Sequence, residues 1–528
     1  MSQTLSLLHR KITLESALED DDNVLQELSY PEQRIQFYVY LLTNRDTIEA
    51  IVSYHLGLGK QRACRIGDVK EWISGSFNVC IPVYIDRPAE IAAKRVLIRF
   101  PLPYKVGELK HPGNAEEKLR SEAATFIWFQ QNYPDIPIPH LWGFGLADGY
   151  CFTAIEHVPV FHRLTWFIRH FISSFFGSWI PCRYVRRHSP YSLKTGYLVM
   201  DYIEKADGVM LSESWDEYHQ DRHRRKTLFR GLSRIMLSLS QSHFERIGSL
   251  TIDNEGVIKL ANRPLTLRIQ HLENESVPTD IDRGLTYPTV DTYLLDLLAC
   301  HDSRLKHSPN SIRDSFDGQA QLSVLTIMRA LLPHFTKRDY CQGPFILSLT
   351  DLHQSNIFVD DEWNIKYLVD LEWTCARPVE MLHPPYWLTN RGVDQLAKGE
   401  HLEAFSDMHN EFMTVLEEEE SSILQRKGRA FSLSLIMRRG WKIGNFWYFH
   451  ALDNPKGLFN IFLDHLQPKF ATLDDFGMAE FERTVAPYWS ADVSEFLSAK
   501  VKEKEVYDKQ LREAFAVADE LAIQGESP

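Results

Sequence analysis

The chain has 528 residues, of which 44% are hydrophobic and 24% charged, and this composition is typical of a globular protein with a large core. Its formal net charge of −13 argues against a protein that binds the phosphate backbone of nucleic acids. The seven cysteines are scattered and form no C-x-x-C pair, which argues against a disulfide framework or a structural zinc site and fits a reducing compartment.

The first part of the chain changes from a helical to a strand-rich pattern. Residues 1–69 are expected to form a helical extension. Short β-branched runs at residues 77–85 and 94–100 predict two strands, and two more are predicted at 151–158 and 196–203. Residues 115–131 contain strong helix formers and neither Gly nor Pro, which predicts a helix. We interpret residues 70–204 as one lobe that carries an insert at about 160–195.

The insert contains the most membrane-like stretch of the chain, at residues 164–182. Arg169 and His170 interrupt it, and its longest uncharged run is shorter than the roughly 20 apolar residues that a bilayer crossing needs. We expect a buried or surface-lying helix and no stable membrane span. The N-terminal residues do not form a convincing signal peptide, so we expect a cytoplasmic protein.

The second part of the chain is mainly helical. Apolar residues at 228, 232, 235, 236 and 239 lie on one face of a helix, and similar stripes follow at 290–301 and 322–332. Short strand signals interrupt the helices at 344–349, 357–359 and 365–369. Strands followed by helices predict an α+β arrangement of two lobes with a cleft between them. We assign 205–500 to a mainly helical lobe and 501–528 to a C-terminal helix.

The residues with the clearest chemistry lie between positions 348 and 373. Asp351 ends a predicted strand, Asn356 follows five positions later, and Asp370 ends a further strand nineteen positions after Asp351. Phosphoryl transfer needs a carboxylate that accepts the proton of the attacking hydroxyl, and oxygen ligands that hold Mg²⁺ against the nucleotide phosphates. We therefore expect these three residues to converge in one cleft.

This stretch resembles the Brenner-type motif of the aminoglycoside phosphotransferase family, which is itself similar to choline and homoserine kinases. The segments RFPLPY, GYLVMDYIE, IGSL and ANRPLT are similar to its fungal branch, and the resemblance covers roughly residues 70–500. It implies a bilobal protein-kinase-like fold that uses ATP and Mg²⁺ to phosphorylate a hydroxyl of a small molecule. Carried over, Asp351 would be the catalytic base, and Asn356 and Asp370 the metal ligands.

The same resemblance implies a nucleotide site in the first lobe. Arg99 stands where the family often has a nucleotide-binding lysine, and Glu122 should be its partner. We expect an ion pair whose guanidinium points to the nucleotide phosphates. Gly75 and Ser76 precede the first predicted strand, where a phosphate-covering loop would lie, although a plain turn fits equally well.

Several alternatives stay open at this level. The family's histidine two positions before the aspartate is replaced by Leu349, and together with Arg99 this supports an alternative, a catalytically silent kinase-like binding module. Glu372 either binds a ligand or is a solvated carboxylate at the end of a strand. The region after residue 374 is expected to form the acceptor pocket or to pack in the core, through the aromatic residues Trp387, Trp441, Trp447 and Tyr448. The acceptor's identity and the oligomeric state cannot be inferred.

Overall fold

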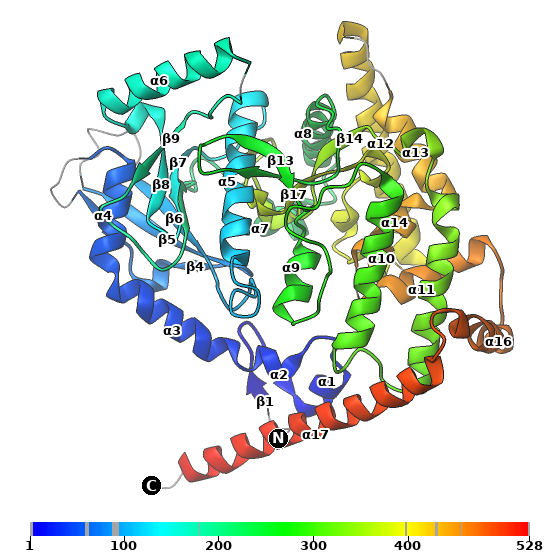
Figure 1. The fold of residues 1–528 in the computed structure, drawn as a ribbon. Helices are drawn as coiled ribbons and strands as arrows, with labels where there is room; N and C mark the ends of the chain where they lie inside the picture. The colour runs from blue at the N-terminus through cyan, green and yellow to red at the C-terminus, as the bar shows by residue number, and fades with distance from the viewer. Residues whose placement is uncertain are drawn as a thin grey trace.

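The computed structural model describes residues 4–58, 63–86, 94–177, 179–396, 399–427, 431–454 and 456–525. The first half of the chain builds a lobe around one large sheet, and the second half builds a lobe that is mainly helical (Figure 1). The predicted α+β fold of two lobes, a protein-kinase-like arrangement with a β-rich N-lobe and a helical C-lobe, is confirmed.

The N-lobe sheet is antiparallel throughout, in the order β3-β5-β6-β10-β7-β8-β9, and β4 also pairs with β5. Its strands are Cys64–Ile66 (β3), Ile73–Ser74 (β4), Asn78–Ile85 (β5), Arg95–Pro101 (β6), Leu141–Gly145 (β7), Tyr150–Ala154 (β8), Tyr184–His188 (β9) and Tyr197–Asp201 (β10). The four predicted strands correspond to β5, β6, β8 and β10, whereas β3, β4, β7 and β9 were not predicted.

Helices cover both faces of this sheet. They are Tyr30–Thr43 (α3) and Arg45–His55 (α4) on one face, and Asn114–Asn132 (α5), the predicted helix, on the other. Successive side chains of a strand point to opposite faces. On β6, Ile98 and Phe100 join the core beneath α4, so Arg99 between them points toward α5. Because α5 also packs on strand Ser249–Ile252 (β12) of the C-lobe, this position lies between the lobes (Figure 1).

The two ends of the chain meet. The N-terminal residues form a hairpin and two short helices, Thr4–Ser6 (β1), Lys11–Thr13 (β2), Leu14–Glu19 (α1) and Val24–Glu27 (α2). They pack on the last helix, Val493–Gly525 (α17), through a small apolar core, and the Tyr507 hydroxyl accepts a hydrogen bond of 2.9 Å from the Val24 N–H. The extension predicted as helical thus also contains strands, and the final helix begins before residue 501.

The C-lobe combines helices with short two- and three-stranded ladders. Its helices are Leu211–Tyr218 (α7), Arg222–Leu239 (α8), Leu267–Asn274 (α9), Val290–His307 (α10), Ser315–Phe335 (α11), Glu400–Lys427 (α12), Leu433–Ile443 (α13), Asn445–Asp453 (α14), Leu458–Ile461 (α15) and Asp475–Val485 (α16). Its strands are Val209–Met210 (β11), Ser249–Ile252 (β12), Ile258–Asn262 (β13), Phe345–Leu349 (β14), Ile357–Val359 (β15), Ile365–Leu368 (β16) and Thr374–Pro378 (β17).

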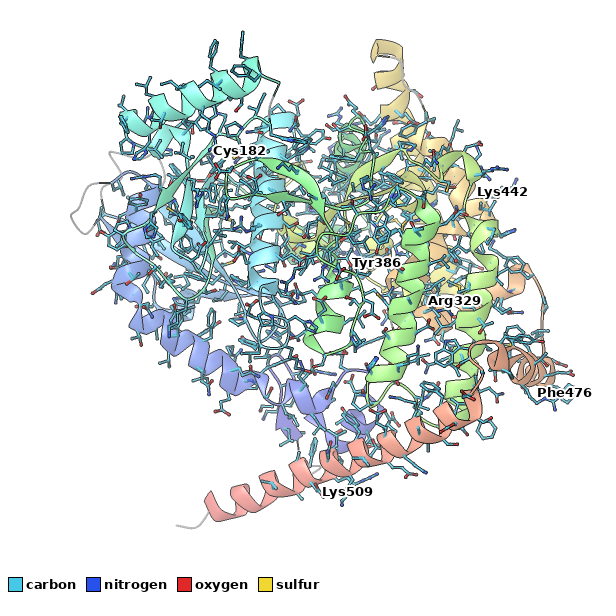
Figure 2. The ribbon with its side chains drawn as sticks, viewed as in Figure 1. Cys182, Arg329, Tyr386, Lys442, Phe476 and Lys509 are labelled. Atoms are coloured by element: carbon cyan, nitrogen blue, oxygen red, sulfur yellow. The ribbon has the colours of Figure 1, made fainter. Side chains whose placement is uncertain are left out.

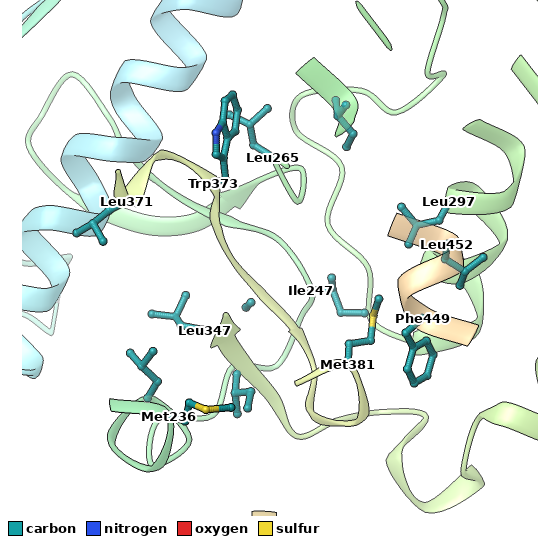
Figure 3. Close-up of a cluster of buried hydrophobic side chains, with 14 of the residues drawn as sticks. Met236, Ile247, Leu265, Leu297, Leu347, Leu371, Trp373, Met381, Phe449 and Leu452 are labelled. Atoms are coloured by element: carbon teal, nitrogen blue, oxygen red, sulfur yellow. The ribbon is translucent and has the colours of Figure 1, made fainter. Parts of the chain in front are cut away.

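The core of the C-lobe lies directly behind the loops that follow β14 and β16. The predicted apolar stripe of α8 is buried, including Leu228 and Leu232. Met236 of this stripe belongs to the same extended buried cluster as Leu347, Trp373 and Phe449, which come from distant parts of the sequence (Figure 3). This packing fixes β14 and the segment after β16 relative to each other.

The insert forms a surface helix, Val160–Phe175 (α6), on the outer edge of the N-lobe (Figure 1). None of its residues is buried. Within the part of the chain that the structure describes, no helix has both the length and the apolar character needed to cross a membrane.

Candidate active site

Asp351 lies in a short loop between β14 and β15 that several hydrogen bonds hold in place. The Asn356 Nδ2 donates to the Asp351 carbonyl at 2.8 Å. The Trp387 Nε1 donates to the Leu352 carbonyl at 2.7 Å, and the Thr350 hydroxyl donates to the Trp373 carbonyl at 2.6 Å. These bonds fix the backbone on both sides of Asp351, so its carboxyl group has a defined position.

The Asp351 carboxyl group titrates near neutral pH. Burial raises its pKa to about 7, and the negative charges of Asp370 and Glu372 add to the effect. A carboxyl group with such a pKa can exchange protons with a substrate near neutrality. The Thr350–Trp373 hydrogen bond and the bond from the Val369 N–H to the Asn356 carbonyl bring the segment that carries Asp370 and Glu372 alongside the Asp351 loop.

Asn356 and Asp370 are joined through the backbone. The Val369 N–H donates to the Asn356 carbonyl at 3.0 Å. Asp370 then adopts a left-handed conformation, with φ 58° and ψ 56°, which is uncommon for a residue other than glycine and is often found at functional sites. Its side chain is 37% exposed, whereas that of Glu372, two residues later, is 3% exposed. The turn therefore separates one accessible carboxylate from one buried carboxylate.

Arg99 forms the expected ion pair with Glu122, with 2.9 Å between its Nη1 and the Glu122 Oε1. The same guanidinium contacts the Glu372 Oε2 at 2.7 Å and also contacts Asp370. Its side chain is 6% exposed, so it does not face open solvent. The Arg99 Nε finds no hydrogen-bond partner among the described residues. Arg99 thus connects the sheet of the N-lobe, α5 and the segment after β16.

Lys118 is a second buried cation at this position, and it is not among the site residues predicted from the sequence. Its Nζ lies 2.5 Å from the Glu372 Oε2 and 3.8 Å from the Glu122 Oε2, and it donates to the Asn78 Oδ1 at 2.7 Å. Lys118 stands four residues before Glu122 on α5, on the same helix face. That spacing was the signal in the sequence that could have identified it.

Glu372 is the centre of this buried ion cluster, and the interpretation of it as a solvated carboxylate was wrong. It accepts hydrogen bonds from Asn78 and Arg99 at 2.8 Å and 2.7 Å, besides its contact with Lys118. Burial alone would favour the neutral acid, but the nearby Lys118 and Arg99 lower its pKa. In contrast, burial raises the pKa of Glu122 to about 7. The two cations therefore stabilise the charged form of Glu372 in spite of its burial.

Gly75 and Ser76 lie at the exposed tip of the β4–β5 hairpin. The Gly75 N–H donates to the Asn78 carbonyl at 2.9 Å, and a Cβ at Gly75 would be in ordinary contact at 3.6 Å, so the turn does not require glycine. The hairpin reaches the ion cluster through Asn78. No contact of Gly75 or Ser76 with Asp351 or Asp370 is described, and a role of this tip over nucleotide phosphates remains a prediction.

A cavity of about 490 Å³ opens beside Asp351 in the C-lobe. Its polar lining includes His383, Tyr386, Asp394 and His450, and Tyr386 lies toward the middle of the molecule (Figure 2). Burial lowers the pKa of His450 to about 4 and that of His383 well below its usual value. Their Nε2 atoms are buried and have no hydrogen-bond partner among the described residues.

The aromatic residues expected at this pocket do not line it. Trp387 is buried and bonded to the Asp351 loop, Trp447 stacks on His465, and the Tyr448 hydroxyl donates to the Met328 carbonyl. Trp441 stacks on His409. On α14 the cavity is lined by positions 449, 450 and 453, which share one helix face, whereas 447 and 448 point elsewhere. The four residues pack in the core, which was the alternative reading.

The oxygen atoms of Asn356 and Asp370 are suitable Mg²⁺ ligands. The Asn356 Nδ2 is bound to the Asp351 carbonyl, whereas its Oδ1 accepts a long hydrogen bond of 3.4 Å from the Ser355 hydroxyl and is the end that a metal ion could contact. Within the described ranges, no group of three or more histidine, cysteine, aspartate or glutamate side chains is arranged to hold a metal ion. A Mg²⁺ ion at Asn356 and Asp370 would therefore complete its shell with phosphate oxygens and water.

The comparisons with known proteins give a distant likeness among solved structures. No family model and no curated protein matches the chain. Among solved structures, the chain is similar to an ethanolamine kinase from Plasmodium vivax, with 12% sequence identity, a TM-score of 0.35, and coverage of 81% of this chain and 84% of that one. A likeness this distant carries no argument about activity. The similarity to the aminoglycoside phosphotransferase family therefore rests on the sequence motifs.

Proposed function

We propose that this protein is a phosphotransferase that moves the γ-phosphate of ATP to a hydroxyl group of a small molecule. The observation that carries the proposal is the placement of Asp351. Its loop borders a 490 Å³ cavity on one side, and on the other it is bonded to Asn356 and lies within the electrostatic reach of Asp370. The proposal therefore takes Asp351 as the proton acceptor, Asn356 and Asp370 as the metal ligands, and the cavity as the acceptor site.

Each residue has a role in this proposal. Asp351 would orient the acceptor hydroxyl and take its proton as the new bond to phosphorus forms. Asn356 and Asp370 would hold Mg²⁺, and Arg99, supported by Glu122, would contact the nucleotide phosphates. Bound Mg²⁺ and ATP would supply the phosphoryl group and neutralise the charge of its oxygens. Gly75 and Ser76 would cover the phosphates.

The cavity supports a small, polar acceptor. Its volume is in the range of small-molecule sites, and Asp351, Tyr386 and Asp394 in its lining carry hydrogen-bonding groups. Arg377 in the wall is already bound to Asp453, at 2.6 Å and 2.8 Å. The lining also contains Arg268, which donates to the carbonyls of Leu297 and Leu452, and the carboxyl groups of Asp351 and Asp394, so it carries groups of both charge signs.

A second candidate function is a kinase-like binding module without catalysis. The contact between Arg99 and Asp370 favours it, because a Mg²⁺ ion at Asp370 has to compete with the guanidinium. In the enzyme this contact would open when nucleotide binds, and in a silent module it would persist.

Thermal-shift titrations with ATP, with Mg²⁺ and with both together separate these functions, because a ligand that binds the folded state raises its apparent stability. The enzyme should respond to the combination far more than to either ligand alone, and Asp370→Asn should remove this synergy. A screen of hydroxylated metabolites for ATP-dependent phosphorylation would then identify the acceptor. If no synergy is seen and no metabolite is phosphorylated, the silent module is the better description.

A further inference from the structure

The insert helix α6 carries an apolar face that points away from the protein. Phe161, Leu164, Ile168, Phe171 and Phe175 follow one another at spacings of three or four residues, which places them on one face of the helix. This face is open: Phe161 is 72% exposed, Phe171 70% and Phe175 75%. An apolar surface of this extent on a protein usually marks a binding site.

The apolar face continues beyond the end of the helix. Phe176 is 73% exposed and Trp179 is 68% exposed. Phenylalanine and tryptophan are the side chains that insert most readily into the boundary between lipid headgroups and acyl chains. The extension therefore adds aromatic anchors of the same kind to the same end of α6.

The opposite side of α6 is attached to the N-lobe. The Trp166 Nε1 donates to the Cys182 carbonyl at 2.8 Å, and Trp166 packs against a small core that includes Val158 and Val185. The Arg163 Nε donates to the Val158 carbonyl at 2.9 Å. The helix is thus fixed with its apolar face outward, at the outer edge of the sheet (Figure 1).

The surroundings of this face are basic, although the whole chain has a net charge of −13. Residues 157–190 contain five arginines and no aspartate or glutamate. Arg169 and Arg186 share the carboxylate of Glu255, and Arg183 pairs with Glu156. The two carboxylates thus balance only part of the charge of the five arginines, and the surface around α6 keeps a net positive charge.

We propose that α6 binds to the surface of an anionic lipid bilayer, with its apolar face in the headgroup region and the arginines of residues 157–190 near the lipid phosphates. A helix with aromatic and aliphatic residues on one face and basic residues beside it lies in the plane of such an interface. Anionic lipids attract the positive surface. A symmetric pair of two chains through α6 would instead bring the same basic surfaces together, which is unfavourable.

Co-sedimentation of the full chain with vesicles tests this proposal. The wild type should bind vesicles of phosphatidylcholine with phosphatidylserine and should bind pure phosphatidylcholine much more weakly. The double variant Phe171→Glu/Phe175→Glu should lose roughly tenfold or more of its vesicle binding, because it places charge in the apolar layer. The matched control is Phe476→Glu on α16, far from α6 (Figure 2), where the side chain is 78% exposed.

A second measurement does not depend on any variant. Binding of the wild type should weaken steeply as salt is raised from low to high concentration, since salt screens exposed charges. The proposal is wrong if the wild type ignores anionic vesicles, if it binds both lipid compositions equally, or if the α6 variant binds as well as the Phe476 variant. It is also wrong if sedimentation velocity shows a dimer that the α6 variant converts to a monomer.

Discussion

Replacing Asp351 by asparagine should stabilise the folded chain in metal-free buffer, and more so at alkaline than at acidic pH. The carboxyl group has a pKa of about 7 in the folded chain, against an ordinary value of 3.8. Between these two values the folded chain holds a proton that the unfolded chain has released. The wild type therefore loses stability as the pH rises from about 4 to about 7, and asparagine, which does not titrate, avoids this loss.

The size of the effect follows from the shift. The pKa of Asp351 rises by about three, and each unit corresponds to about 1.4 kcal/mol, so the wild type loses roughly 4 kcal/mol of folding stability above pH 7. Roughly half of this loss has already occurred at about pH 5.5. The gain from Asp351→Asn should thus be about 2 kcal/mol larger at about pH 8.5 than at about pH 5.5.

Urea unfolding of both proteins at the two pH values, with a chelator present, gives this difference. The matched control is Asp361→Asn, an exposed aspartate on the hairpin after β15, which should show no pH-dependent gain. If the gain in the free energy of unfolding of the Asp351 variant is equal at the two pH values, the pKa of Asp351 is not raised by burial and neighbouring negative charges.

Three further changes test the rest of the site. Asp370→Asn keeps a residue that tolerates the left-handed turn, so it should leave the melting temperature nearly unchanged and abolish Mg²⁺-dependent nucleotide binding, measured by calorimetry. Asn356→Ala should weaken Mg²⁺-dependent nucleotide binding less, because the Asp370 carboxylate can still bind the metal. An equal loss in both variants would contradict the role of Asp370 as the main metal ligand. Glu372→Gln should destabilise the fold by about 3–5 kcal/mol, because it leaves Arg99 and Lys118 short of a buried charge. The exposed Glu362→Gln should cost less than about 0.5 kcal/mol in the same urea titration.

Local sequence patterns were enough for the main elements of the fold. The β-branched runs predict strands β5 and β6, and the strong helix formers predict helix α5. Because side chains alternate between the two faces of a strand, Arg99 on β6 can then face Glu122 on α5. Of the strands that were missed, β3 pairs with β5 and β9 pairs with β8 across intervening segments, so this pairing rather than their own composition makes them strands.

The missing parts of the site depend on contacts between distant segments. Glu372 follows a strand by a few residues, and nothing in its neighbours reveals that Lys118 and Asn78 from the N-lobe bury it. Similarly, aromatic residues near the cavity were predictable, but which face of α14 meets it was not. Tyr386 lines the cavity, whereas the adjacent Trp387 donates a hydrogen bond to the Asp351 loop. Tertiary packing determines which of these two neighbours points into the cavity.

The central claim is that Asp351 serves phosphoryl transfer, and ADP release from ATP measures it most directly. The assay contains Mg²⁺ and a panel of hydroxylated small molecules, and water itself can act as a poor acceptor. We expect turnover by the wild type and by Asp361→Asn, and a loss of at least about 100-fold in Asp351→Asn, the usual size of a general-base contribution. Equal turnover in the wild type and Asp351→Asn, or binding of Mg²⁺ and ATP without any turnover, would contradict the claim.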